Sequence, residues 1–222
     1  MTALAAIFYF LAQHSLWSLP LLVLAGLAAG ACLARWLGHP AWYALGIAGF
    51  VAGMANVFTG SMANALFVNA FGRYGSAVIT HAEQTSSQLN EQYVWAYDAV
   101  LKTADGRDVK FHFDTLSASL YPVRNEIELP PKGERFVVKY MPGFERSVVI
   151  MRDESPFGRR RLVQRARAPV ERARAQLAAS PGNDGFRQEY RQALQQFLGT
   201  YQHDAPPGLV QQYRTELQAT GS

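Results

Sequence analysis

The sequence predicts an α+β membrane protein with a two-helix transmembrane hairpin, a five-strand antiparallel small β-barrel and a C-terminal helical hairpin. Charge segregation is the first observation, because Arg35 and Arg73 are the only charged residues among the first 82. Short segments of alternating polarity then continue to about residue 151, and helical spacing returns after them. We therefore expect four segments along the chain. They are an interfacial lead-in (1–15), the transmembrane hairpin (16–73), the β-barrel (74–152) and an arginine-rich segment with the C-terminal helices (153–222).

Two apolar segments in the first third are long enough to cross a bilayer. Leu16–Ala34 and Pro40–Thr59 each reach the length of about 20 residues that a helix needs to span the hydrocarbon core. The Gly-His-Pro sequence at 38–40 favours a turn between them. A cleaved signal peptide is the alternative for the N-terminus, but residues 1–7 contain no basic residue and no convincing small-residue cleavage site follows.

Small and amide residues recur on one face of each span, at steps of three and four residues. The predicted helix-packing residues are Gly26, Gly30, Gly46, Gly49, Gly53, Asn56, Gly60 and Asn64. Small residues let helix backbones approach closely in lipid, which supplies no hydrophobic force between helices. Packing within the hairpin, homo-oligomerisation and no special role all remain open. Within an antiparallel hairpin we expect Gly30 to match Gly49 in depth and Gly26 to match Gly53, while both asparagines need polar partners.

Five segments after the hairpin show the pattern of β-strands. They are Ala77–Ile79, Tyr93–Thr103, Val109–Thr115, Phe136–Met141 and Ser147–Met151. Alternation is clearest in the third, and Asp105-Gly106 before it favours a tight hairpin turn. Five short strands with little helical pattern between them predict a small, partly closed barrel, whose closure would limit exposed strand edges.

The β-segments carry a family resemblance. Residues 75–80, Tyr97, Asp105-Gly106 and residues 132–142 resemble a DUF3592-like bacterial domain of unknown function over about residues 74 to 151. This resemblance implies a membrane-anchored small β-barrel. Its motifs are turn glycines and alternating strands, and no catalytic motif comes with them.

Apolar residues at helical spacing mark the C-terminal section. Phe186, Tyr190, Leu194, Phe197 and Tyr201 fall on one helical face. Asn183 or Asp184 is the expected N-cap of this helix, and Pro206-Pro207 opens a final one. The expected role of the stripe is a helical core.

Seven arginines precede these helices, with a single acidic residue, Glu171, among them. They are Arg159, Arg160, Arg161, Arg165, Arg167, Arg172 and Arg174. Anionic lipid headgroups are a possible partner, a plain solvated helix is the alternative, and nucleic acid is disfavoured because aromatic residues are not interleaved with the arginines. Pro169 predicts two short basic helices in place of one continuous helix.

The sequence contains no pattern typical of a catalytic, cofactor or metal site. Its five histidines lack metal-ligand spacing, and no serine lies in a nucleophile motif. His112 beside Asp114 predicts either a pH-sensitive contact or an ordinary solvated strand face. Cys32 is the sole cysteine and lies in the first span, so the rest of the chain has no internal disulfide. We expect no enzyme, no cofactor and no metal.

These features lead to two functional hypotheses. The first is a membrane-tethered, non-enzymatic module that presents the barrel and the basic helical tail to a protein partner or to the membrane surface. The alternative is a subunit of a larger membrane complex, assembled through the glycine and asparagine face of the second span. We expect the lipid bilayer of the bacterial inner membrane as the location, with the soluble part in the cytoplasm.

Overall fold

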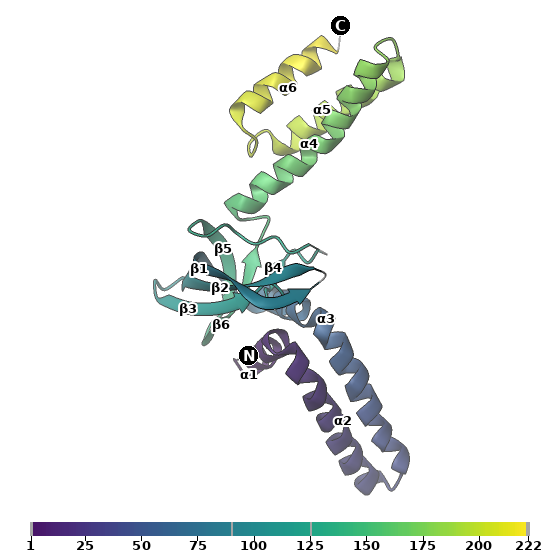
Figure 1. The fold of residues 1–222 in the computed structure, drawn as a ribbon, viewed down its shortest axis with the longest axis vertical. Helices are drawn as coiled ribbons and strands as arrows, with labels where there is room; N and C mark the ends of the chain where they lie inside the picture. The colour runs from purple at the N-terminus through teal and green to yellow at the C-terminus, as the bar shows by residue number, and fades with distance from the viewer. Residues whose placement is uncertain (1, 90, 125, 221–222) are drawn as a thin grey trace. The chain divides into compact units, whose positions relative to one another are not determined.

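The computed structural model describes residues 2–89, 91–124 and 126–220 and divides the chain into two compact units. Residues 1–155 form the first unit and residues 156–222 the second. The described residues form six α-helices and a six-stranded sheet (Figure 1), which confirms the α+β class. Each unit has a buried apolar cluster of its own.

Helices precede the sheet in the first unit. They are α1 (Thr2–Gln13), α2 (Ser15–Leu37), the 3₁₀-helix η1 (Pro40–Ala44) and α3 (Leu45–Phe71). α2 ends at Gly38, whose left-handed backbone (φ 70°) is the conformation that glycine adopts most readily. The His39 side chain then accepts a hydrogen bond from the backbone N–H of Ala41 (3.2 Å) and starts η1. α2 begins at Ser15, so Pro20 lies inside the helix.

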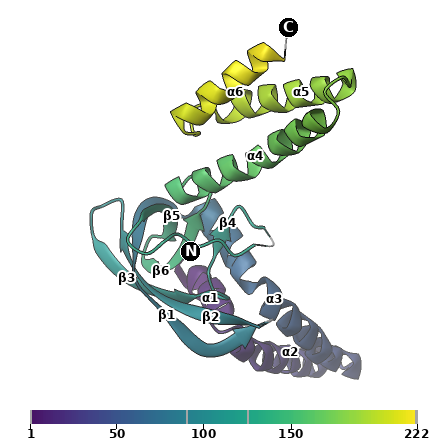
Figure 2. The same cartoon turned by 45° about the horizontal axis from the view of Figure 1, so that its top comes forward.

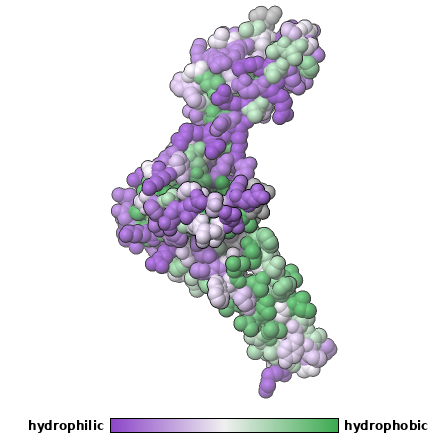
Figure 3. Space-filling model, in the orientation of Figure 1, coloured by the Kyte–Doolittle hydropathy of each residue, from purple (hydrophilic) through white to green (hydrophobic). Residues whose placement is uncertain are grey.

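α2 and the continuous η1–α3 segment are long and apolar enough to cross a membrane. The first covers 23 residues with a mean hydropathy of 2.0 in its apolar window, and the second covers 32 residues with a value of 1.5. Only 11% of each window is buried inside the protein, whereas the core helix of a soluble protein is mostly buried. Figure 3 shows the resulting apolar surface along the hairpin. The two helices are therefore candidate membrane spans.

Six strands form one sheet in the order β3-β2-β1-β5-β6-β4. Their bounds are β1 (Arg73–Leu89), β2 (Gln92–Lys102), β3 (Asp108–Asp114), β4 (Leu120–Tyr121), β5 (Arg135–Met141) and β6 (Phe144–Met151). Neighbours are antiparallel except for β4, which pairs with β6 in parallel. Gly106 and Gly143 have φ of 84° and 80° at the turns before β3 and β6, as hairpin turns require.

The partly closed five-strand barrel predicted by the sequence is wrong, because the sheet is open and has six strands. β3 and the two-residue β4 are its edges, and β4 lacks a recognisable alternating pattern. The physical reason lies in β6, whose Val149 and Met151 pack against Ala5, Ala65 and Val68 of the helices. Helices therefore cover apolar surface that a closing strand would otherwise cover (Figure 2).

Three helices form the second unit, namely α4 (Pro156–Ala179), α5 (Asp184–Tyr201) and α6 (Pro207–Ala219). The Asn183 side chain accepts a hydrogen bond from the N–H of Phe186 (3.2 Å), which confirms it as the N-cap of α5. Buried Leu194, Phe197 and Tyr213 pack together in the core of the unit, and the Phe197 and Tyr213 rings meet edge-on with centroids 4.9 Å apart.

The break expected at Pro169 does not occur, because α4 continues through it to Ala179. Pro169 is exposed, so water can satisfy the carbonyl group that loses its intrahelical partner. Val163, Val170 and Ala173 lie on the opposite, buried side and belong to the core of the unit. Core packing of residues before and after Pro169 in the sequence therefore stabilises one continuous helix.

Candidate functional site

Except for Gly46, where a Cβ atom would meet the Leu27 side chain, the glycines predicted to pack the spans lie where backbone meets backbone. A Cβ atom at Gly49 would overlap the carbonyl group of Leu22, and a Cβ atom at Gly53 would lie 2.9 Å from the Cα of Leu19. At Gly60 the same atom would lie 2.8 Å from the carbonyl oxygen of Leu11, at the end of α1. Real Cβ contacts are not this short, so the helices approach as closely as they do because these residues have no side chain.

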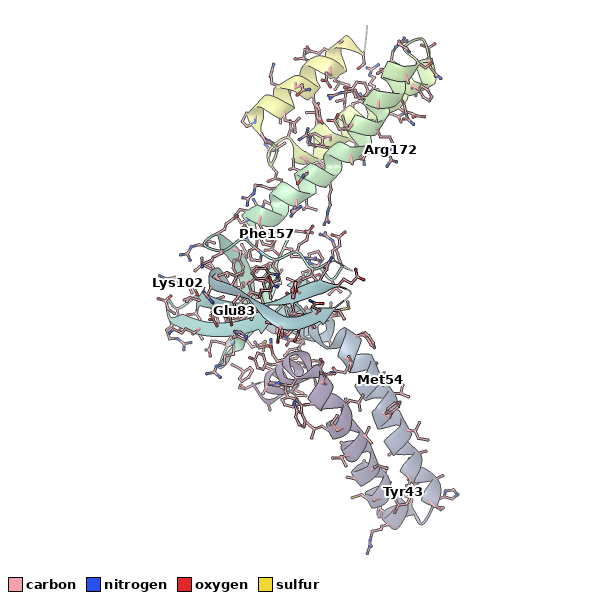
Figure 4. All side chains as sticks on the ribbon, in the orientation of Figure 1. Tyr43, Met54, Glu83, Lys102, Phe157 and Arg172 are labelled. Carbon is pink, nitrogen blue, oxygen red and sulfur yellow. The ribbon has the colours of Figure 1, made fainter. Side chains whose placement is uncertain are left out.

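The expected depth matching within the hairpin is wrong. A Cβ atom at Gly26 would lie 3.3 Å from the Cα of Gly46, and at Gly30 it would meet Trp42 and Tyr43, so neither glycine faces its predicted partner. The reason is η1, which folds back beside the last turns of α2 and displaces the start of α3. Figure 4 shows Tyr43 at this turn end of the hairpin, with Met54 farther along α3.

Asn56 satisfies its amide at the junction of the three N-terminal helices. Its Nδ2 donates to the carbonyl oxygen of Leu11 (2.9 Å) and to Oγ of the buried Ser18 (2.7 Å). Ser18 in turn donates to the carbonyl oxygen of Ser15 (2.6 Å). A polar group inside an apolar helix pair is costly unless it is bonded, so this network determines how α1 and α2 meet α3.

Asn64 joins the hairpin to the sheet. Its side chain is 2% exposed; Nδ2 donates to Oγ of Ser119 (2.8 Å), and Oδ1 accepts from Oγ of Ser147 (3.1 Å) in β6. Both serines are buried. Lys139 of β5 adds a second link, since its Nζ donates to the backbone and side-chain oxygens of Asn69, each at 2.8 Å. The sheet is thus bonded directly to the end of α3.

The lead-in predicted for residues 1–15 forms the helix α1, which packs on both α3 and β6. Phe8 stacks on Phe67 of α3 with ring centroids 4.6 Å apart. Tyr9 meets Phe144 of β6 edge-on at 5.3 Å. Figures 1 and 2 both show α1 on the side of the sheet from which the hairpin extends.

A groove of about 430 Å³ lies beside α1 and is also lined by residues of β1, β2, β3 and β6. On β3, Phe111 and Phe113 are buried in the sheet's interior, whereas Lys110 and His112 point to the outer face. We call the groove the basic groove. Its polar lining is Tyr9, Thr80, Asp98, Lys110, His112 and Arg146, from α1, β1, β2, β3 and β6.

The carboxylate partner of His112 differs from the one that the sequence suggests. His112 Nδ1 lies 3.0 Å from Oδ1 of Asp98, directly across the β2–β3 pair. Asp114 instead accepts hydrogen bonds from the N–H groups of Leu116 (2.8 Å) and Ser117 (2.7 Å), which shape the loop after β3. The carboxylate that lies beside His112 depends on the register between β2 and β3, which the sequence alone does not define.

The seven arginines of α4 have different environments. Arg174 is half-buried and donates to Tyr190 (3.0 Å), Glu171 (3.1 Å) and Glu216 (2.6 Å), while Arg167 lies 3.7 Å from Glu171. Arg159 lies 3.9 Å from Asp204. The remaining four are exposed, and Figure 4 shows Arg172 projecting from α4. They are Arg160, Arg161, Arg165 and Arg172. A basic surface is therefore present, although Arg174 belongs to the internal structure of the unit.

Burial and the hydrogen bond to the carboxylate of Glu216 together raise the pKa of Tyr190 to about 12. The bond from the Arg174 guanidinium acts in the opposite direction. At the β2–β3 turn, the Thr103 hydroxyl and the Arg107 guanidinium lower the pKa of Asp105 to about 2. These perturbed groups support a helix bundle and a turn, and they do not converge on one pocket.

Among the residues that the structure describes, no group of three or more histidine, cysteine or acidic residues could hold a metal ion. The five histidines remain scattered, as their sequence positions suggest. No family model, curated protein or solved structure matches this chain. The arrangement of residues is therefore the basis for any proposal about function.

Several important residues lack a signal in the sequence. Ser18, Ser119 and Ser147 complete the asparagine networks, and Tyr9 and Arg146 complete the basic groove. These residues lie far apart in the chain and meet only through tertiary packing. The alternation of β3 places Lys110 on the outer face, but nothing in the pattern indicates that α1 lies beside it.

Proposed function

We propose that this chain is a membrane-anchored, non-enzymatic interaction module of the bacterial inner membrane. In this proposal α2 and α3 cross the bilayer, and the open sheet is a platform for a protein partner at its surface. The observation that carries the proposal is the buried Asn64, which bonds the sheet to the end of α3 through Ser119 and Ser147. A platform bonded in this way keeps a defined orientation to the membrane, whereas a flexible tether would not.

An exposed apolar surface on the sheet is the candidate contact for a partner. Tyr93 and Trp95 lie on the same face of β2 and are 47% and 40% exposed. Tyrosine and tryptophan are enriched where proteins bind one another, because they combine a large contact area with a polar group. The open edge of β3 offers unpaired backbone groups nearby for strand addition.

The alternative, assembly through the glycine and asparagine face of α3, has less support. That face is occupied within the chain, since Gly49 and Gly53 contact α2 and Asn56 bonds to Leu11 and Ser18. A partner helix would need to use the outward side of α3, where Ile47 and Phe58 are 70% and 72% exposed. Apolar side chains of this kind suit lipid.

Cytoplasmic placement of the sheet and of the second unit is part of the proposal. The arginine-rich α4 supports it, because positive residues are retained on the cytoplasmic side of bacterial membranes. The sole cysteine, Cys32, also lies in a candidate span, and this is consistent with a reducing compartment.

Three experiments test the proposal on the full chain. Alkaline carbonate extraction should leave the protein in the membrane, and a C-terminal tag should resist protease in spheroplasts until the membrane is opened. Capture of crosslinked partners should then be lost in Tyr93→Ser/Trp95→Ser. A matched pair, Ile47→Ala/Phe58→Ala, changes the lipid side of α3 and should leave capture intact. The opposite pattern of loss would replace the platform with assembly through the spans, and release by carbonate would reject membrane anchorage.

A further inference from the structure

The basic groove has an excess of positive charge. Lys110 and Arg146 are both exposed, and neither forms a hydrogen bond or an ion pair with another described residue. Asp98 is the only carboxylate in the lining, and His112 already lies 3.0 Å from it. The neighbouring carboxylate of Glu145 accepts from Arg107 (2.9 Å), outside the groove. With two cations and one carboxylate in its lining, the groove has a net positive charge.

The chemistry of the lining suits a phosphate group. A guanidinium and an ammonium supply charge-assisted donors for phosphate oxygens, and the hydroxyl group of Tyr9 supplies a neutral one. The Thr80 hydroxyl already donates to the carbonyl oxygen of Asp98 (3.1 Å). The free donors come from three different elements, so they come together only in the folded chain. A volume of about 430 Å³ leaves room for more than a single ion.

The position of the groove indicates where the phosphate comes from. α1 forms one end of it, on the side from which the hairpin extends (Figures 1 and 2). The outer side of α1 carries Leu4, Ile7 and Phe10, which are 49%, 54% and 36% exposed. If the hairpin crosses a bilayer, this apolar side and the groove lie at the same surface, where lipid phosphates are the most abundant anions.

We propose that the basic groove binds a phosphate-bearing anion, with Lys110 and Arg146 as its cationic contacts and the headgroup of an anionic phospholipid as its source. This inference rests on the proposed membrane anchorage. It is separate from the arginine surface of α4. That surface belongs to the second unit, whereas all the residues that line the basic groove belong to the first.

Native mass spectrometry of the full chain in a neutral detergent tests the proposal directly. Phosphatidylglycerol should be retained at least about tenfold more tightly than phosphatidylcholine with the same acyl chains. Lys110→Gln/Arg146→Gln should lose this preference by about tenfold or more, and Lys110→Arg/Arg146→Lys should keep it. The matched control, Arg161→Gln/Arg172→Gln, removes two exposed cations from α4 and should bind as the unchanged chain does.

Further measurements distinguish a lipid headgroup from free phosphate as the bound anion. Inorganic phosphate as competitor distinguishes the two sources: weak competition assigns the site to the lipid headgroup, and competition equal to that of the lipid assigns it to free phosphate. Either result supports a phosphate site if it is lost in the groove variant. Unchanged binding in the groove variant, or a loss confined to the α4 control, overturns the proposal. If the double variant does not fold, each single variant should show an intermediate loss. Carbonate extraction of every variant reports anchorage separately.

Discussion

The hairpin α2–α3 and the helices of the second unit pack by opposite means. In the hairpin, glycines such as Gly49 and Gly53 bring backbones into contact, and large side chains such as Phe58 point outward. In the second unit, large side chains such as Leu194 and Phe197 fill the core, while the outer surface carries arginine and glutamine. In water, burial of large apolar groups stabilises a fold. In lipid it does not, so helices in a bilayer associate through close packing of their backbones. The contrast supports two different solvents for the two regions.

The polar networks differ in the same way. Asn56 and Asn64 use neutral amide and hydroxyl groups, whereas the second unit joins Arg174 to Glu216 and Tyr190 at its partly exposed rim. Neutral groups have a smaller desolvation cost, which suits an apolar setting. Charged groups keep contact with water in the second unit and remain ionised.

The largest expected effect is at a hairpin glycine. Gly49→Leu should destabilise the protein by more than about 3 kcal/mol, because the new side chain overlaps the Leu22 carbonyl group and separates the helices. Gly199→Leu is the matched control, since no heavy atom lies within 4 Å of a Cβ at Gly199 in α5; its stability should stay the same or rise by up to about 1 kcal/mol, because leucine favours a helix more than glycine does. Unfolding in sodium dodecyl sulfate, followed by circular dichroism, measures both. Equal midpoints would contradict close packing in the hairpin.

Asn64→Ala tests the joint between the hairpin and the sheet. The change leaves the hydroxyls of Ser119 and Ser147 buried without their amide partner, and it should cost about 2 to 3 kcal/mol. Hydrogen exchange should speed up in β6 and in the segment around Ser119. Thr59→Ala is the control, because the Thr59 hydroxyl is exposed and donates to Ala55 of its own helix (2.9 Å). Unchanged exchange in β6 would show that apolar packing alone holds the joint.

The smallest effect concerns pH and the second unit. Because burial and the Glu216 carboxylate raise the pKa of Tyr190 to about 12, the folded unit keeps a proton that the unfolded chain releases near pH 10. Its stabilising contribution is complete below about pH 10 and is lost as the pH rises through 12, a change of about 2 kcal/mol. Residues 156–222 contain no lysine, so lysine titration in this unit does not overlap with that of tyrosine.

Urea unfolding of the full chain between pH 9 and 12, followed by helical circular dichroism, measures this dependence. Tyr190→Phe should lower the stability at pH 9 but flatten its fall with pH. Tyr201→Phe removes another tyrosine hydroxyl from the same helix and should keep the unchanged slope. Identical slopes in all three proteins would exclude Tyr190 as the group responsible.

Patterns within short stretches of sequence correctly predicted several helices, turns and caps. The first third, with few charged residues, contains two long apolar helices, Asp105-Gly106 forms a turn, and Asn183 caps α5. The expected stripe of α5 is largely buried, with Tyr190, Leu194 and Phe197 in the core. Each of these features follows from hydrophobic period or backbone preference within a few residues, which a sequence displays directly.

The sequence by itself determined where charge, apolar length and glycine lie along the chain, and so which segments form helices and strands. The tertiary structure decided which surfaces meet: the open sheet in place of a barrel, the shifted register of the hairpin, and Asp98 as the partner of His112. It also brought Tyr9, Lys110 and Arg146 to one groove. Contacts between distant segments depend on the balance of packing over the whole unit, and no local pattern records that balance.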